Sequence, residues 1–466
     1  MYFSADEQAV IDETISPVSI PAGSSYANYA TGPLDLSESY YWKVNEVNEA
    51  ETPSTWESNI WSFTTSDNIV VDDFESYNDL DPGDPASKRI FNVWIDGYGV
   101  ATNGSLVGYE NPPFCEQTIV HGGKQSMPFS YSNTGGAAYS EAELTLSAAQ
   151  DWTAGGAKTL SLYFHGTSGN TGQLYVKING SKVAYDGDAS NLARAAAWQA
   201  WNIDLASSGA GLQNVTKLNI GIDGNGASGT LLFDDIRLYS YSRQLITPAE
   251  PSQVGLVGHY EFEGNTNDSA SGNHGTVEGG PTYVEGKIGG ALKFDGNADQ
   301  ITLKDPLTVG SSSNTVAAWV KVPLAGTERL GATERVGIVL GNYDDSPNTN
   351  WEIHSAGQMR LYWNAGQISR YGTTDLRDDT WHHIAWVRDK ATNANYMYID
   401  GQLEAMIATL GTDITFNTTH KIGGDNRPNP PNFHGLLDDV QIYSRALSQE
   451  EIAWLAGRKQ PFDKPF

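Results

Sequence analysis

The chain has 466 residues, and its 56 Asp and Glu against 28 Lys and Arg give a net charge of -28. This charge argues against nucleic acid or an anionic membrane as a partner, and no apolar run reaches the ~18 residues that a membrane span needs. Aromatic residues make up 11% of the chain, Gly reaches 49 residues, and charged residues make up only 18%. This composition favours strands joined by tight turns, so we expect an all-β extracellular protein of roughly two to four domains. The single cysteine, Cys115, excludes an internal disulfide.

Residues 1–67 predict a short β-module. Segments 39–47 and 56–65 alternate apolar and polar residues, which is the period of a strand with one buried face. Their Tyr-Tyr-Trp and Trp-Ser-Phe-Thr-Thr runs resemble the last strands of a fibronectin type III-like domain. Such a domain has about seven strands, and Tyr2–Ser4 would already be a middle strand. The resemblance therefore implies a partial module, with upstream domains and a signal peptide missing before Met1, in a secreted or cell-surface protein.

Residues 68–242 predict a second β-unit. Strand-like runs at 70–77, 159–165, 173–179, 198–205, 217–222 and 231–239 are separated by turns rich in Gly, Asn and Ser. The unit resembles the calcium-containing jelly-roll carbohydrate-binding modules of polysaccharide-degrading enzymes. The resemblance is carried by Asp73-Phe-Glu75 in the first strand, Gly122-Gly-Lys-Gln-Ser126-Met in an early strand, and Asp234-Asp235-Ile in the last strand.

This resemblance implies a structural Ca²⁺ where the first and last strands meet. Glu75 and Asp235 would be the side-chain ligands, and Lys124 or Gln125 would supply a backbone carbonyl. Carboxylates that adjacent strands bring together repel each other unless a cation lies between them. The alternative is that these acids cap turns or face water.

Residues 243–252, with Pro248 and Pro251, predict a linker, and residues 253–466 predict a third unit. Segments 260–263, 267–273, 289–296, 315–320, 380–388, 397–401 and 437–440 resemble, in this order, the laminin-G-like and concanavalin-A-like jelly rolls. The resemblance implies a second Ca²⁺ between Asp268 and Asp439, with Glu263 nearby. Asp400-Gly401 predicts a hairpin turn, and Ser448 with Glu451 predicts the capping box of a short helix. In both large units we expect the last strand to return beside the first.

Flat aromatic rings with polar side chains beside them are the usual means of binding sugar rings. In the third unit the candidates follow the turn at 345–350, of which 345–347 lie outside the residues that the structure describes. They are the rings of Trp351, Tyr362, Trp363 and Tyr371, with Asn364 and Arg370 beside them. In the second unit the candidates are Trp94 and Tyr98. For each single ring, burial in the core is the alternative.

Catalysis is the less favoured reading. Retaining glycosidases need two carboxylates ~5 Å apart around one bond, and the chain has no Glu-x-Asp-x-x-Glu run. Glu141 and Glu143 have the spacing of one strand face, as do Glu261 and Glu263, but the third acid is missing. We therefore predict a non-catalytic array of polysaccharide-binding modules that holds an upstream enzyme or a cell surface against its glycan. The alternatives are a glycoside hydrolase or polysaccharide lyase, and a structural adhesion or surface-coat protein that binds other proteins.

Overall fold

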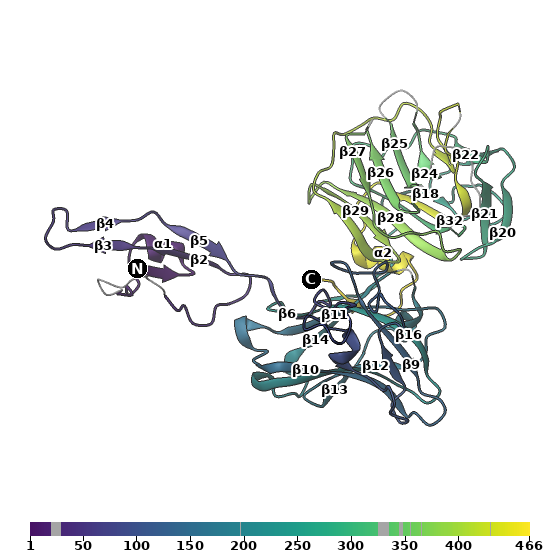
Figure 1. Ribbon diagram of the computed structural model, residues 1–466. Coiled ribbons are helices and arrows are strands. Elements are labelled where there is room, and N and C mark those ends of the chain that lie inside the picture. Colours follow the sequence, from purple (N-terminus) through teal and green to yellow (C-terminus); the bar gives the residue numbers. More distant parts are fainter. Residues whose placement is uncertain are drawn as a thin grey trace. The chain divides into compact units, whose positions relative to one another are not determined.

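The computed structural model describes residues 1–19, 29–195, 197–324, 335–343, 348–354, 356–364, 366–428 and 430–466. These residues form antiparallel β-sheets with very little helix, which confirms the predicted fold class (Figure 1). The chain divides into two compact units, which from here on are called the first and second units: residues Met1–Leu245 with Asp463–Phe466, and residues Ile246–Phe462. The first holds the predicted N-terminal module and the predicted second β-unit, and the second holds most of the predicted third unit. Two short strands, β17 (Leu245–Ile246) and β33 (Phe462–Asp463), lie at these divisions. No helix among the described residues has the length and apolar character of a membrane span.

The N-terminal part of the first unit holds a small three-stranded sheet of β1 (Tyr2–Ser4), β2 (Ser39–Lys43) and β5 (Trp61–Thr64). Strands β3 (Asn45–Val47) and β4 (Thr55–Glu57) form a separate ribbon. The single strand expected over 56–65 is thus two strands. Ser58 separates them because its hydroxyl group accepts from the amide of Val44 and donates to the carbonyl of Asn59. A short helix that we did not expect, α1 (Glu7–Ile11), is capped by Asp6.

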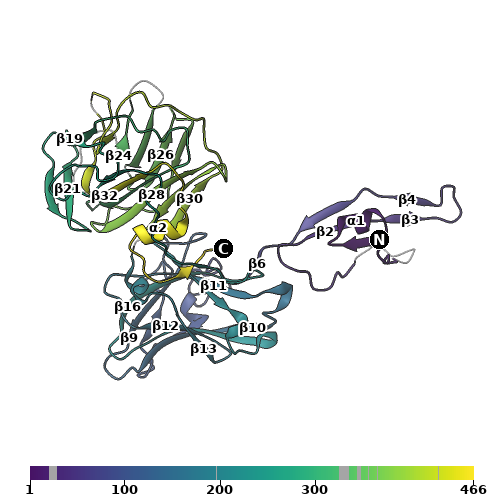
Figure 2. The same ribbon diagram turned by 180° about the vertical axis from the view of Figure 1, so that it is seen from behind.

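The rest of the first unit is a two-layer sandwich (Figure 2). One sheet has the order β13-β12-β15-β10-β7, and the other has the order β14-β11-β16-β9-β8, with β6 also paired to β16. Rings such as Trp94, Phe164 and Trp201 fill the space between the layers. The strand bounds are β6 (Asn68–Asp72), β7 (Trp94–Ile95), β8 (Ser105–Val107), β9 (Met127–Ser132), β10 (Tyr139–Gln150), β11 (Thr159–His165), β12 (Gln173–Ile178), β13 (Ser181–Ala184), β14 (Gln199–Asp204), β15 (Val215–Asp223) and β16 (Ser228–Tyr239). Short 3₁₀ turns lie at Ile90–Asn92, Ala154–Gly156, Ala189–Ala193, Leu205–Ser207 and Leu212–Asn214.

The second unit is also a two-layer sandwich. One sheet has the order β20-β21-β32-β23-β28-β29-β30, with β18 paired to β32, and the other has the order β19-β22-β31-β24-β25-β26-β27. Their bounds are β18 (Leu256–Tyr260), β19 (Gly275–Glu278), β20 (Thr282–Glu285), β21 (Gly290–Asp295), β22 (Gln300–Leu303), β23 (Asn314–Lys321), β24 (Arg335–Gly341), β25 (Thr349–His354), β26 (Met359–Trp363), β27 (Ile368–Tyr371), β28 (Trp381–Asp389), β29 (Ala394–Ile399), β30 (Gln402–Ile407), β31 (Lys421–Ile422) and β32 (His434–Tyr443). The predicted helix is α2 (Gln449–Leu455), and its capping box between Ser448 and Glu451 is present.

The last long strand returns beside the first in both sandwiches, as we expected. Strand β16 pairs with β6, and β32 pairs with β18. In both strands the Asp-Asp pair interrupts the ladder, because the second aspartate has a positive φ of 48°. This irregularity places two consecutive carboxylates at a corner of each sandwich, where the first strand ends.

Candidate functional site

A band of polar side chains crosses the outward face of the β19-β22-β31-β24-β25-β26-β27 sheet. Strand β25 explains how it forms: Trp351 and Ile353 point into the core between the sheets, so Asn350 and Glu352 point to the other face of the sheet, where both are also buried. Cross-strand pairing continues the band on both sides, with Asn350 opposite Tyr362 and Glu352 opposite Arg360. We call this band the polar strip. Its strand residues are Glu278, Gln300, Thr302, Asn350, Glu352, Arg360, Tyr362, Ser369, Tyr371 and Lys421, and loop residues Tyr343, Asp425, Arg427 and Asn432 adjoin it.

One end of the polar strip is organised around Glu278 on β19. Its carboxylate accepts hydrogen bonds from Gln300 Nε2 at 2.5 Å and Thr302 Oγ1 at 2.7 Å, and it pairs with Lys421 Nζ at 3.2 Å. Burial acts to raise the pKa of Glu278, but the bonds from Thr302 and Lys421 outweigh it and lower that pKa. Glu278 is therefore ionised at neutral pH, and its charge is matched by Lys421.

The middle of the polar strip holds Asn350 against a loop carboxylate. Asn350 Nδ2 donates to Asp425 Oδ2 at 3.3 Å, and Arg427 Nη2 pairs with the same oxygen at 2.5 Å. The Arg427 guanidinium lies over the ring of Tyr343 at 4.4 Å. A Cβ atom at Gly341 would lie 2.4 Å from Asn350 Oδ1, so only glycine leaves room for this amide.

The other end of the polar strip combines tyrosine rings with a buried arginine. Arg360 is 7% exposed, pairs with Glu352 Oε1 at 2.5 Å and donates to Ser369 Oγ at 2.9 Å. Its guanidinium lies 5.0 Å from the ring of Tyr362 and 5.2 Å from the ring of Tyr371. Tyr371 is 42% exposed, so this end offers an accessible ring beside groups that hydrogen-bond.

Three amide oxygens along the polar strip have no hydrogen-bond partner among the described residues. They are Gln300 Oε1, Asn350 Oδ1 and Asn432 Oδ1. The orientation of each amide follows from its NH₂ group: that of Gln300 faces Glu278, that of Asn350 faces Asp425, and that of Asn432 faces backbone carbonyls. The unpaired atoms are therefore acceptors, but they are buried, and those of Asn350 and Gln300 lie against Gly341 and Gly424.

The predicted aromatic residues of the second unit fall into two groups. Tyr362 and Tyr371 lie on the polar strip, whereas Trp351 and Trp363 are 1% exposed and belong to the core, so their rings cannot stack on a sugar. Arg370 is exposed and lies opposite the core residue Leu361, off the strip.

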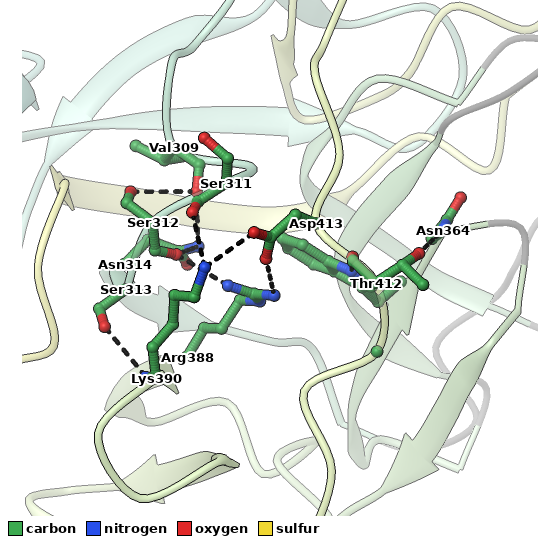
Figure 3. Close-up of polar contacts among 12 residues, drawn as sticks. Val309, Ser311, Ser312, Ser313, Asn314, Asn364, Arg388, Lys390, Thr412 and Asp413 are labelled. Atoms are coloured by element: carbon green, nitrogen blue, oxygen red, sulfur yellow. Dashed lines mark hydrogen bonds and ion pairs between the residues drawn. The ribbon is translucent and has the colours of Figure 1, made fainter.

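Trp363 has a structural role at one end of the sandwich. Its Nε1 donates to the carbonyl of Thr412, and Arg388 lies over its ring at 4.9 Å. Figure 3 shows the surrounding network, in which Asp413 joins Arg388 and Lys390, and Asn364 contacts Thr412. Asn364 thus fixes a loop rather than extending the polar strip.

The predicted aromatic residues of the first unit do not form a platform together. Trp94 is fully buried, and its Nε1 donates to Asp72 Oδ2 at 2.9 Å. Tyr98 is 85% exposed, so its ring is accessible, but no ring contact joins it to Trp94. The alternation of apolar and polar residues along strands could not predict the different exposures of Trp94 and Tyr98, because both rings flank a loop-rich segment.

The predicted calcium ligands of the first unit lie at the corner formed by the Asp-Asp pair, but not as the sequence suggested. Strand β6 ends at Asp72 and β9 begins at Met127, so Glu75 and residues 122–125 lie in loops rather than strands. Glu75 Oε1 accepts from the amides of Lys124 and Gln125, whose carbonyls were expected to face the metal. The strand ends early because Phe74 adopts a positive φ of 61°.

Both oxygens of Asp235 already have side-chain partners. Arg237 Nη2 lies 2.6 Å from Oδ1, and His121 Nδ1 lies 2.7 Å from Oδ2. Burial would raise the pKa of Asp235, but the bonds from His121 and Arg237 outweigh it and lower that pKa. The neighbouring Asp234 has no such counter-charge, and burial raises its pKa to about 7.

The second unit repeats this corner with different residues. His259 Nε2 contacts Asp439 Oδ1 at 2.6 Å, and the amide of His259 donates to Asp268 at 2.8 Å. Glu263 Oε1 accepts from the amide of Gly290 at 2.9 Å. Asp438 accepts from the amides of Lys287 and Ile288, and burial raises its pKa to about 6.

Calcium prefers six to eight oxygen ligands, and the corners as described do not fit it. The candidate carboxylates Glu75, Asp235, Glu263, Asp268 and Asp439 are engaged by amides, histidines or an arginine. Within the described residues no group of three or more His, Cys, Asp and Glu side chains is arranged to hold a metal ion. The sequence did not point to His121 and His259, because they lie far from the Asp-Asp pairs along the chain.

The glutamate pair on β10 does not resemble a catalytic pair. Glu141 and Glu143 point to one face and both accept from Asn219 Nδ2, at 3.1 and 3.3 Å. Lys177 pairs with Glu141, and Lys217 pairs with Glu143. The bond from Lys217 lowers the pKa of Glu143, whereas a general acid needs a raised one.

No curated protein matches the chain. Among solved structures, it is similar to domain 4 of an extracellular arabinanase from Geobacillus stearothermophilus in complex with arabinotriose, with 24% identity, a TM-score of 0.37, and coverage of 44% of this chain and 100% of that one. It is similar to a sialidase CBM40 of Ruminococcus gnavus bound to α2,3-sialyllactose, with 18% identity, a TM-score of 0.27, and coverage of 32% and 84%. The binding domain of Paraclostridial Mosquitocidal Protein 1 gives 17% identity, a TM-score of 0.36, and coverage of 43% and 52%, so the chain spans about half of it.

Similarity at this level is no basis for assigning a ligand. The family comparison identifies a defined segment of the chain: residues 295–453 match the concanavalin A-like lectin/glucanases superfamily. This segment includes strands β22 to β32 and most residues of the polar strip. Residues 295–453 therefore form a concanavalin-like jelly-roll domain, as the sequence predicted for the third unit.

Proposed function

We propose that this protein is a non-catalytic, extracellular polysaccharide-binding protein, and that it binds glycan on the polar strip of its second unit. The observation that carries the proposal is the exposed ring of Tyr371, which shares one sheet face with Tyr362 and with arginine, amide and carboxylate groups. A sugar ring needs both elements, an aromatic surface for its C–H face and polar groups for its hydroxyls. The strip crosses seven strands, which suits a chain of sugars rather than one residue.

The protein would act as a tether in this proposal. It would hold an upstream enzyme or a cell surface against a polysaccharide, with modest affinity per site. The glutamate pair on β10 supports a non-catalytic role, because both of its members are paired with lysines. No feature of the described residues favours a hydrolase, a lyase or a protein-binding adhesin over a polysaccharide-binding protein.

The test is a binding measurement on Tyr371→Ala. We expect this change to weaken binding to the best ligand of a polysaccharide array by about fivefold to tenfold, because stacking contributes about 1 kcal/mol. The matched control is Tyr283→Ala on β20, whose ring is 43% exposed but belongs to the opposite sheet. Equal loss in both variants, or loss in neither, contradicts the location.

A reducing-sugar assay on the bound polysaccharides separates binding from catalysis. The proposal expects no release of reducing ends above the level of a heat-denatured sample. Sustained release by the purified chain would replace the proposal with the hydrolase reading. Binding to purified surface proteins without binding to any polysaccharide would replace it with the adhesion reading.

A further inference from the structure

We infer, given the proposed glycan-binding function, that the polar strip selects uncharged polysaccharides and rejects uronate-rich or sulfated ones. The balance of charges on the strip points to this class of ligand. The inference adds the chemical class of ligand to a site whose existence is the earlier proposal.

Each cation of the polar strip is matched by its own carboxylate. Lys421 pairs with Glu278, Arg427 with Asp425, and Arg360 with Glu352. Arg360 and Asp425 are buried, so these pairs are shielded from solvent and hold their partners firmly. No cation among these three is left to neutralise an anionic sugar. The net charge of -28 on the chain adds repulsion at long range.

The experiment measures binding of the full chain to soluble polysaccharides at about 0.05 M and about 0.5 M NaCl, which lie below and above physiological ionic strength. The neutral probes are arabinan, xylan, mixed-linkage β-glucan and galactomannan, and the acidic probes are polygalacturonate, alginate and chondroitin sulfate. We expect binding to at least one neutral probe, with an affinity that changes by less than about twofold between the two salt concentrations. We expect no binding to the acidic probes.

Glu278→Gln tests the charge balance directly. It removes the partner of Lys421 at a side chain that is 42% exposed, so folding should be preserved. We expect this variant to gain weak binding to polygalacturonate at about 0.05 M NaCl, and to lose that binding at about 0.5 M NaCl, where salt screens the charge of Lys421. Glu285→Gln on the opposite sheet is the control, because it changes the total charge equally but lies off the strip.

The outcomes separate the two proposals. Salt-dependent binding of an acidic probe by the unmodified chain overturns the inference and leaves the glycan-binding function intact. An equal gain in both variants also overturns it, because total charge would then explain the effect. Absence of binding to every probe overturns the proposed function itself, and the inference with it.

Discussion

Single residues decide on which face of a sheet each side chain of this protein lies. On β25, Trp351 and Asn350 are neighbours, yet one ring fills the core and the other side chain lies on the polar strip. The period of two along a strand would have predicted this, since Asn350, Glu352 and His354 alternate with Trp351 and Ile353. Ring type alone does not separate these cases: of the candidate rings, Tyr98 and Tyr371 are exposed, because the first lies in a loop and the second on the polar face of a strand.

The residue His382 predicts a pH dependence of stability. Burial acts to lower its pKa, but contacts from Asp378 and Asp400 outweigh it and raise the pKa to about 10. The unfolded value is about 6.5, so the protonated form stabilises the fold fully below pH ~6.5, and this contribution is lost as the pH rises through about 10. We expect His382→Gln to lose on the order of 3 kcal/mol at pH 6 and much less at pH 10.

Urea unfolding at pH 6, 8 and 10 measures this difference. Comparison of the variant with the unmodified chain at each pH cancels the titration of other groups. A difference that stays constant across the three values would show that His382 is neutral in the fold.

At the scale of elements, local turn and cap signals were reliable. The Asp400-Gly401 turn joins β29 to β30 with φ values of 50° and 82°, as a two-residue hairpin requires. The capping box at Ser448 also formed as predicted. Two strand predictions were wrong. Strand β6 ends earlier than predicted because Phe74 has a positive φ, and the predicted strand 56–65 is divided into β4 and β5 by the side-chain hydrogen bonds of Ser58.

The hairpin turn predicts a strict requirement for glycine at position 401. A Cβ atom there would lie 2.8 Å from the backbone of Ala453, and the positive φ disfavours any other residue. We expect Gly401→Ala to lower the free energy of unfolding by about 2 kcal/mol or more. Gly280→Ala is the control, since a Cβ atom there meets nothing within 4 Å. Chemical denaturation of both variants checks this, and equal stabilities would contradict it.

At the scale of the whole molecule, each sandwich joins its first and last strands at a corner built from an Asp-Asp pair and a histidine. The corners of the two units use His121 with Asp235 and His259 with Asp439. This shared device, rather than sequence repetition, makes the two units alike. It also bears on the predicted calcium sites, since internal donors engage the carboxylates expected to bind the metal.

Thermal melting of the full chain in calcium or in chelator tests that prediction. Because Arg237 and His121 already occupy both carboxylate oxygens of Asp235, we expect Tm to differ by less than about 1 °C between the two conditions. Magnesium at equal concentration controls for general screening of the acidic surface. A rise of several degrees with calcium alone, lost in Glu75→Gln, would support the metal site and contradict the closed corner.

The all-β class, most strand positions, the α2 cap and the Asp400-Gly401 turn were predictable from sequence, because they depend on residues close together along the chain. The concanavalin-like segment that the family comparison places at 295–453 was predictable too. Which rings are buried, and which partners the acids take, depends on contacts between distant parts of the chain. Gln300, Asn350 and Arg360 come from different strands, and His121 reaches Asp235 across 114 residues. Such contacts depend on sheet order and register, which local patterns do not encode.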